Sequence, residues 1–137
     1  MGETYVLDSY ALLVLLGGEA GGDEVAALLR AAQEARACVL MTWVNLGEVA
    51  YIVERRSGER RLLQVMAMLE ATALEVTPVE RELALAAAHI KAQYPLAYAD
   101  AFAAALATQA DAVLVTGDPE FHLLEDSIRI RWLPRNE

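Results

Sequence analysis

Cysteine is nearly absent from this sequence, since Cys38 is the only one among 137 residues. A single thiol forms no internal disulfide, which excludes the disulfide-stabilised secreted domains. Cys38 lies in the apolar segment 37–41, so we expect a buried small side chain in the reducing environment of a cytoplasm. The chain also lacks a basic and then apolar leader, because Glu3 and Asp8 interrupt its start, and we expect no signal peptide.

Long apolar runs and basic residues are also scarce. No apolar run reaches the roughly 20 residues that a membrane-spanning helix needs, so we expect a cytoplasmic protein with no membrane association. The 11 Lys and Arg residues against 20 Asp and Glu residues give a net charge of −9. Because phosphate contacts dominate nucleic-acid affinity, this charge disfavours tight, metal-free binding of nucleic acid. The negative charge is a weaker argument against an enzyme that contacts its substrate briefly through bound metal.

The apolar fraction, in contrast, is high at 56%, which excludes a disordered chain. The length suits one domain over residues 1–137 with a single core. Short β-branched or aliphatic runs alternate with helical patterns from start to finish. This alternation predicts an α/β fold in which helices cover both faces of a mostly parallel sheet of about five strands.

The expected elements follow from these periodicities. The segment Thr77-Pro78-Val79-Glu80 has the form of a capping box, with Pro78 as the first helical residue. The expected strands are 4–7, 37–41, 74–76, 112–115 and 128–132, and the expected helices begin at 9, 23, 43, 59, 78 and 96.

Four carboxylates lie in apolar stretches, where an unpaired charge is costly: Asp8, Glu48, Asp100 and Asp118. Asp8 and Asp118 are at the carboxyl ends of expected strands, where the functional groups of open parallel sheets gather. Glu48 shares a helix face with Asn45, and Asp100 shares one with small alanines. Because like charges repel, gathering these acids requires a divalent cation. Oxygen ligands favour Mg²⁺ or Mn²⁺, and no His or Cys has the spacing of a zinc ligand.

Each acid also has an ordinary structural interpretation. Asp8 and Asp118 are good helix N-caps, Asp100 complements a helix dipole, and Glu48 suits a solvated helix stripe. Thr116 either orients a phosphate or a metal-bound water, or is an ordinary strand residue. Four arginines at a helix junction either form a solvated face or meet phosphates or an acidic partner; they are Arg55, Arg56, Arg60 and Arg61.

Four segments that contain these acids carry a more specific resemblance. In this order, and over nearly the whole chain, they resemble the four motifs of PIN domains. Together they resemble the VapC-type toxins of prokaryotic toxin–antitoxin pairs. The segments are Val6-Leu7-Asp8-Ser9, Asn45-Leu46-Gly47-Glu48-Val49-Ala50-Tyr51, residues 99–107 and Val115-Thr116-Gly117-Asp118-Pro119-Glu120-Phe121.

The resemblance implies a three-layer α/β/α domain with Mg²⁺- or Mn²⁺-dependent endoribonuclease activity. It also implies a homodimer that a small antitoxin protein neutralises. Carried over by position, Asp8, Glu48, Asp100 and Asp118 are the acidic quartet that holds one or two cations, and Thr116 is the supporting hydroxyl. The resulting hypothesis is metal-assisted hydrolysis of an RNA phosphodiester, in which Glu48 completes the cage or acts as general base.

Two other functions remain open. In the first, the chain is a binding module whose acidic pocket binds an Arg of a partner, and catalysis is vestigial. A cluster of carboxylates suits a bidentate contact with a guanidinium. In the second, the chain is a phosphoryl-aspartate protein, which needs a Lys near the phosphate. The phosphatase form of that class also needs an Asp at position 10, where this chain has Tyr10, and the single lysine, Lys91, lies inside an expected helix.

Overall fold

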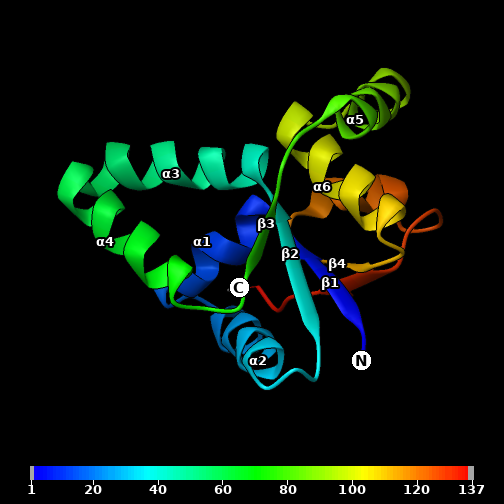
Figure 1. The fold of residues 1–137 in the computed structure, drawn as a ribbon. Helices are drawn as coiled ribbons and strands as arrows, with labels where there is room; N and C mark the ends of the chain where they lie inside the picture. The colour runs from blue at the N-terminus through cyan, green and yellow to red at the C-terminus, as the bar shows by residue number, and fades with distance from the viewer. Residues whose placement is uncertain (1, 136–137) are drawn as a thin grey trace.

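The computed structural model describes residues 2–135 and contains a five-stranded sheet with the order β3-β2-β1-β4-β5 (Figure 1). All four strand pairings are parallel. No helix in the described part of the chain is long and apolar enough to cross a membrane. The strands are β1 Thr4–Leu7, β2 Cys38–Thr42, β3 Glu75–Thr77, β4 Val113–Thr116 and β5 Ile130–Trp132. The helices are α1 Ser9–Gly17, α2 Gly22–Gln33, α3 Trp43–Ser57, α4 Glu59–Glu70, α5 Arg81–Gln93, α6 Tyr98–Gln109 and the 3₁₀ helix η1 Pro119–Leu124.

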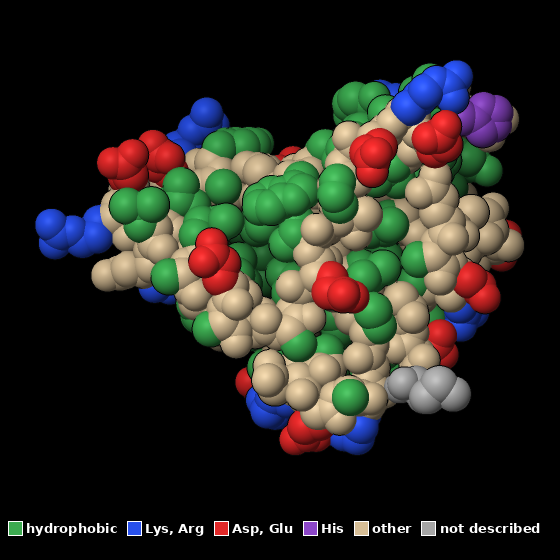
Figure 2. All heavy atoms as spheres, in the orientation of Figure 1, with side chains coloured by type: hydrophobic (Ala, Val, Ile, Leu, Met, Phe, Trp, Pro, Cys, Tyr) green, Lys and Arg blue, Asp and Glu red, His purple; other side chains and the backbone are tan. Residues whose placement is uncertain are grey.

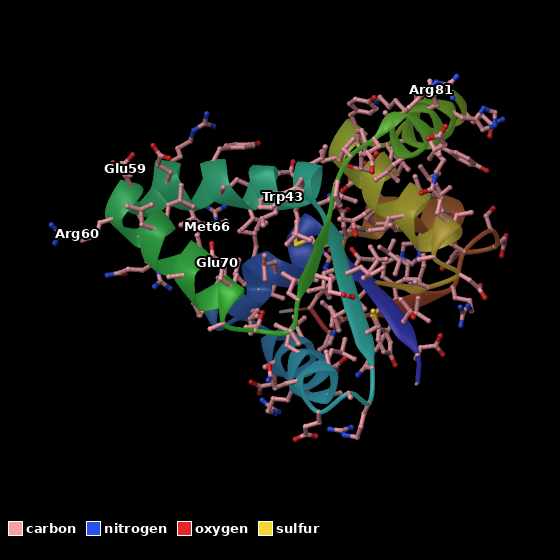
Figure 3. All side chains as sticks on the ribbon, in the orientation of Figure 1. Trp43, Glu59, Arg60, Met66, Glu70 and Arg81 are labelled. Carbon is pink, nitrogen blue, oxygen red and sulfur yellow. The ribbon has the colours of Figure 1, made fainter. Side chains whose placement is uncertain are left out.

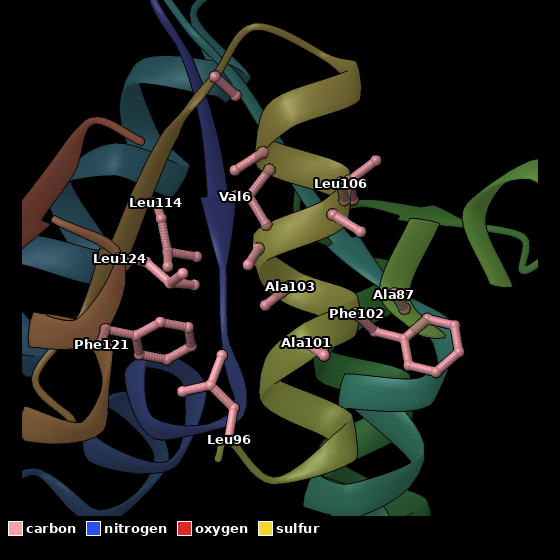
Figure 4. Packing of buried hydrophobic residues seen from close by; sticks show 14 of the residues in the cluster. Val6, Ala87, Leu96, Ala101, Phe102, Ala103, Leu106, Leu114, Phe121 and Leu124 are labelled. Atoms are coloured by element: carbon pink, nitrogen blue, oxygen red, sulfur yellow. The ribbon is translucent and has the colours of Figure 1, made fainter. Parts of the chain in front are cut away.

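The two central strands are apolar on both faces because each face is covered by helices. Successive strand residues point to opposite faces, so Val6 packs with the cluster that includes α6 and η1, whereas Leu7 packs with α1, α2, α3 and α4. In β4, Leu114 and Val115 divide in the same way. Figure 4 shows Val6, Leu114 and Phe121 gathered beside α6. The expected three-layer α/β/α architecture with a parallel sheet is therefore confirmed.

Alanine makes α6 a close neighbour of the sheet. The side of α6 that faces the protein is built from small residues, and the helix contacts β1, β2 and β4. Small side chains let a helix approach a strand closely, which brings the first turn of α6, with Asp100, near the ends of the central strands. The fully or almost fully buried alanines are Ala101, Ala103, Ala104, Ala105 and Ala107.

The expected capping box at Thr77 is wrong. Thr77 is the last residue of β3, where it pairs with Thr42, and α5 begins only at Arg81 with Glu80 in the N-cap position. A residue that precedes proline is disfavoured in a helix and favoured in extended backbone. Pro78 therefore follows the end of a strand and does not open a helix. The other expected strands and helices are present, with ends shifted by a few positions.

Cys38 is only partly buried, contrary to the expectation from its apolar neighbours. Its thiol donates a hydrogen bond to Oε2 of Glu75 on the adjacent strand β3, at 3.0 Å. This hydrogen bond is the main cause of a pKa raised above the usual value of the thiol, with burial and the Glu75 charge adding to it. Cys38 therefore carries little reactive thiolate at neutral pH.

Candidate metal centre

The candidate site lies where β1 and β4 end side by side at the centre of the sheet. After β1 the chain enters α1, which packs in the core cluster that contains Leu7. After β4 it enters η1, which packs in the core cluster on the other face of the sheet, with Val6 and α6. Open parallel sheets bind their ligands at the carboxyl ends of strands, where the connections diverge in this way. Asp8 follows β1 directly, and Asp118 follows β4 after Gly117.

Asp8 is an N-cap and also belongs to the acidic site. Its Oδ1 accepts a hydrogen bond from the backbone N–H of Ala11 at 2.8 Å, and its Oδ2 accepts one from the Thr116 hydroxyl at 2.5 Å. A carboxylate has about four lone-pair sites, so these two bonds leave acceptor capacity for a cation. The side chain is buried, and burial is the largest cause that raises the pKa of Asp8 to about 7. The hydrogen bonds oppose this rise, while the charges of Asp100 and Asp118 add to it.

Thr116 connects the acid after β1 to the acid after β4. Its buried hydroxyl donates to Asp8 and accepts from the backbone N–H of Asp118 at 3.0 Å. In this structure the hydroxyl therefore orients the Asp8 carboxylate and fixes the backbone at Asp118. Asp118 in turn caps η1, because its Oδ1 accepts from the backbone N–H of Glu120 at 2.9 Å. The interpretation of Asp118 as an N-cap before a proline is thus confirmed.

Three carboxylates converge beside Asp8. Asp100, Asp118 and Glu120 each offer an oxygen atom, and these oxygens lie within 4.8 Å of one another. Asp100 is only 8% exposed, whereas Glu120 is at the surface. The pKa of Asp100 is raised to about 7, mainly by burial and then by the charges of Asp118, Glu120 and Glu48 in that order. A set of oxygen ligands with this much mutual repulsion fits a hard divalent cation.

Of the four acids predicted from the sequence, Asp100 and Asp118 belong to this group, together with Glu120, which was not predicted. Asp8 and Glu48 are outside the group; the charges of Asp100 and Asp118 raise the pKa of Asp8. Glu48 is half-buried on α3, close enough to Asp100 for its charge to affect the Asp100 pKa. Glu120 was missed because the prediction considered the acids within apolar runs or at strand ends, and Glu120 lies two residues beyond the acid at the end of the β4 run. The available signal was the order Asp118-Pro119-Glu120, since a helix that begins at Pro119 places Glu120 in its first turn beside the N-cap.

Asn45 on α3 forms hydrogen bonds with α1, with α6 and with the end of β2. Its side-chain amide donates to the Ala99 carbonyl oxygen at 2.9 Å and to Oγ of Ser9 at 3.4 Å. Its Oδ1 accepts from the Thr42 hydroxyl at 2.6 Å. Asn45 is completely buried. Because these contacts reach α6, α1 and the end of β2 from α3, Asn45 fixes the relative position of the segments that carry the acids.

We expect Asn45→Ala to lower the free energy of unfolding by about 1–3 kcal/mol, since it leaves buried polar partners without their hydrogen bonds. The measurement is urea unfolding followed by circular dichroism. The matched control is Gln64→Ala, which removes an exposed helical amide on α4 and is expected to change stability by less than about 0.5 kcal/mol. Equal stabilities of the two variants would show that the Asn45 contacts do not hold the site together.

Lys91 does not supply the lysine that a phosphoryl-aspartate protein needs near its phosphate. Lys91 lies inside α5, as expected, and its Nζ donates to the carbonyl oxygen of Leu96 at 2.5 Å. Tyr10 occupies the first turn of α1, where a phosphatase of that class would need its second aspartate. The residues around Asp8 are thus acids and hydroxyls, which suits cation binding and not phosphoryl transfer to Asp8.

Several solved structures have a similar fold. VapBC2 from Rickettsia felis, bound to a DNA fragment from its promoter, matches with a TM-score of 0.74 and 14% identity, covering 96% of this chain and 99% of that chain. DNA-bound VapBC from Salmonella typhimurium matches with a TM-score of 0.72 and 22% identity, over 96% and 98% of the two chains. VapC20 from Mycobacterium tuberculosis, a toxin that cleaves the sarcin–ricin loop, matches with a TM-score of 0.67 and 18% identity, over 87% and 93%.

At these identities the likeness establishes the fold. A comparison with curated protein sequences found no match. The sequence does match the family model of the PIN domain over residues 5–126. That span runs from β1 through η1 and includes every acid of the candidate site. The chain therefore belongs to the PIN-domain family.

Proposed function

We propose that this chain is a metal-dependent endoribonuclease that acts as the toxin of a toxin–antitoxin pair. The observation that carries the proposal is the meeting of the Asp100, Asp118 and Glu120 oxygens within 4.8 Å, next to the buried Asp8. Mg²⁺ and Mn²⁺ are the cations that such oxygen ligands favour. The likeness in fold to a sarcin–ricin loop cleaving toxin and to VapBC structures supports the proposal. We extend it to a cytoplasmic homodimer with a small antitoxin as partner.

The roles of the side chains follow from their positions. A divalent cation supplies Lewis acidity at a phosphodiester and lowers the pKa of a bound water. Asp100, Asp118 and Glu120 would hold the cation, and Asp8 would add an oxygen from the buried side. The Thr116 hydroxyl keeps the Asp8 carboxylate oriented. Glu48, half-buried on α3, would complete the site or accept a proton from the attacking water.

We expect the purified protein to cleave structured RNA, tRNA included, when Mn²⁺ or Mg²⁺ is added. A chelator abolishes the cleavage, and excess Mn²⁺ restores it, because the acids alone provide no positive charge to stabilise the phosphate. Gel analysis of the RNA measures the effect. Cleavage that persists in chelator would exclude the metal mechanism, and the absence of cleavage with every divalent metal would exclude the enzyme.

A binding module is the second candidate function. This function is favoured by the repulsion among Asp100, Asp118 and Glu120. An arginine side chain from a partner would relieve that repulsion through a bidentate contact. The chelator assay separates the two functions. Tight binding of an antitoxin without RNA cleavage under any metal would support the module.

A further inference from the structure

The side of α3 that bears Glu48 continues away from the acids with an aromatic residue and then a basic one. At 3.6 residues per turn, Glu48, Tyr51 and Arg55 fall on one side of the helix. The Arg55 guanidinium carbon lies 5.2 Å from the centroid of the Tyr51 ring. Tyr51 is 49% exposed, and the guanidinium covers one face of its ring, so part of the ring is open to a ligand. We call these three residues the α3 track.

Exposed Trp and Tyr side chains in the described residues occur only on the two helices that carry Glu48 and Asp100. Trp43 and Tyr51 belong to α3, and Tyr98 belongs to α6 two residues before Asp100. Each of the three is 49% exposed. Unstacked nucleic-acid bases stack on aromatic rings of this kind, and this stacking tolerates any base sequence. The exposed Trp and Tyr rings thus lie on the same helices as Glu48 and Asp100.

Four of the arginines without an ion-pair partner among the described residues lie at the α3–α4 junction near this track, whereas Arg30, which also has none, lies on α2. Ion pairs occupy Arg36, Arg81, Arg129 and Arg131. None is formed by the four arginines at the α3–α4 junction: Arg55, Arg56, Arg60 and Arg61. Figure 3 places Arg60 at the far end of the α3–α4 hairpin from Trp43, with Glu59 nearby, and Figure 2 shows both basic and acidic side chains at that end. The segment 54–61 holds four arginines and two glutamates, so its formal charge is positive. In a chain of net charge −9, this local positive charge is complementary to phosphates.

We propose that the α3 track is a docking surface for single-stranded RNA, with a base stacked on Tyr51 and a phosphate paired with Arg55. Glu48 and Arg55 are about 10 Å apart along the helix axis, so a ligand that reaches both is extended. An acidic protein segment would also pair with the arginines, but its carboxylates gain nothing from the face of the Tyr51 ring. RNA uses the ring and the charge together. The choice of RNA rests on the proposed function, whereas the surface rests on the Tyr51–Arg55 geometry.

The test is fluorescence anisotropy with a short labelled oligoadenylate and chelator present, so that cleavage does not interfere. We expect Tyr51→Ala to weaken binding by about 5- to 100-fold and Tyr51→Phe to retain it, because stacking needs the ring and not the hydroxyl. We expect Arg55→Ala to weaken binding and to reduce the slope of log affinity against log salt by about 0.7. Arg81→Ala, which removes an exposed arginine on α5, is the control and is expected to bind as the unmodified protein does.

Unchanged binding in Tyr51→Ala, or no binding by the unmodified protein, would overturn the docking surface. So would an Arg55→Ala variant that loses affinity for polyglutamate while keeping its affinity for RNA, because the partner would then be an acidic protein. This outcome is separable from a failure of the proposed function. If RNA binding depends on Tyr51 but no metal-dependent cleavage occurs, the docking surface is retained and the enzyme function is excluded. If the protein cleaves RNA but Tyr51→Ala and Arg55→Ala bind RNA as the unmodified protein does, the enzyme function is retained and the docking surface is excluded.

Discussion

Replacing Asp100 by Asn lowers Mn²⁺-dependent RNA cleavage at least about a hundredfold while the protein stays folded. Asp100 is the most buried member of the group of three whose oxygens lie within 4.8 Å of one another. Asparagine has nearly the same shape but brings no negative charge, so it weakens cation binding. A catalytic cation supplies several kcal/mol of transition-state stabilisation, and about 1.36 kcal/mol corresponds to a tenfold change in rate. Initial rates of RNA cleavage at fixed Mn²⁺ measure the loss.

Asp8→Asn is expected to lose cleavage as well, and Asp126→Asn provides the matched control. Asp126 is an exposed acid in the turn after η1, so its replacement changes the net charge equally without touching the site. Circular dichroism spectra establish whether each variant is folded. A folded Asp8→Asn or Asp100→Asn protein with full activity would end the proposed mechanism.

The second large effect is a loss of stability in the metal-free protein as the pH rises from about 4 to about 7. The pKa of Asp8 is about 7 in the folded protein against 3.8 for an unperturbed aspartate. The folded state therefore keeps a proton that the unfolded state has released, and its stability falls as the pH rises through this window. The difference corresponds to about 4 kcal/mol for Asp8, and the raised pKa of Asp100 acts in the same direction.

Urea unfolding of the unmodified protein and of Asp8→Asn across this pH range, with chelator present, measures the effect. We expect Asp8→Asn to be the more stable protein at pH 7, since its neutral amide avoids both the burial of a charge and the repulsion from Asp100 and Asp118. Asp126→Asn is expected to keep the pH dependence of the unmodified protein. If the stability advantage of Asp8→Asn were absent or grew toward low pH, the assigned burial of charge would be wrong.

The sequence was sufficient for the features that depend on local patterns. Asp8 and Asp118 were placed at strand ends because each interrupts or follows an apolar run, and the alanines after Asp100 predicted a helix close to the sheet. The layer arrangement followed from the alternation of strands and helices. These predictions required only periodicity and the rule that parallel strands need helical crossovers.

Features that depend on contacts between distant segments could not be predicted from the sequence. The Thr116 hydroxyl orients Asp8 only because β1 and β4 are neighbours in the sheet, although 108 positions separate the two residues. Cys38 was expected to be buried, but its surroundings include Glu75 from another strand. Local rules also competed at Thr77, where the capping pattern favoured a helix and pairing with Thr42 retained the strand.

Calorimetric titration of Mn²⁺ into the metal-free protein near pH 7 tests the convergence of the acids into a cation site most directly. The expected result is saturable binding that is lost in Asp100→Asn and retained in Asp126→Asn. Because Asp8 and Asp100 have pKa values of about 7, binding is also expected to release protons, which titrations in buffers of different ionisation enthalpy detect. No saturable binding, or equal binding by the unmodified protein and Asp100→Asn, would contradict the account.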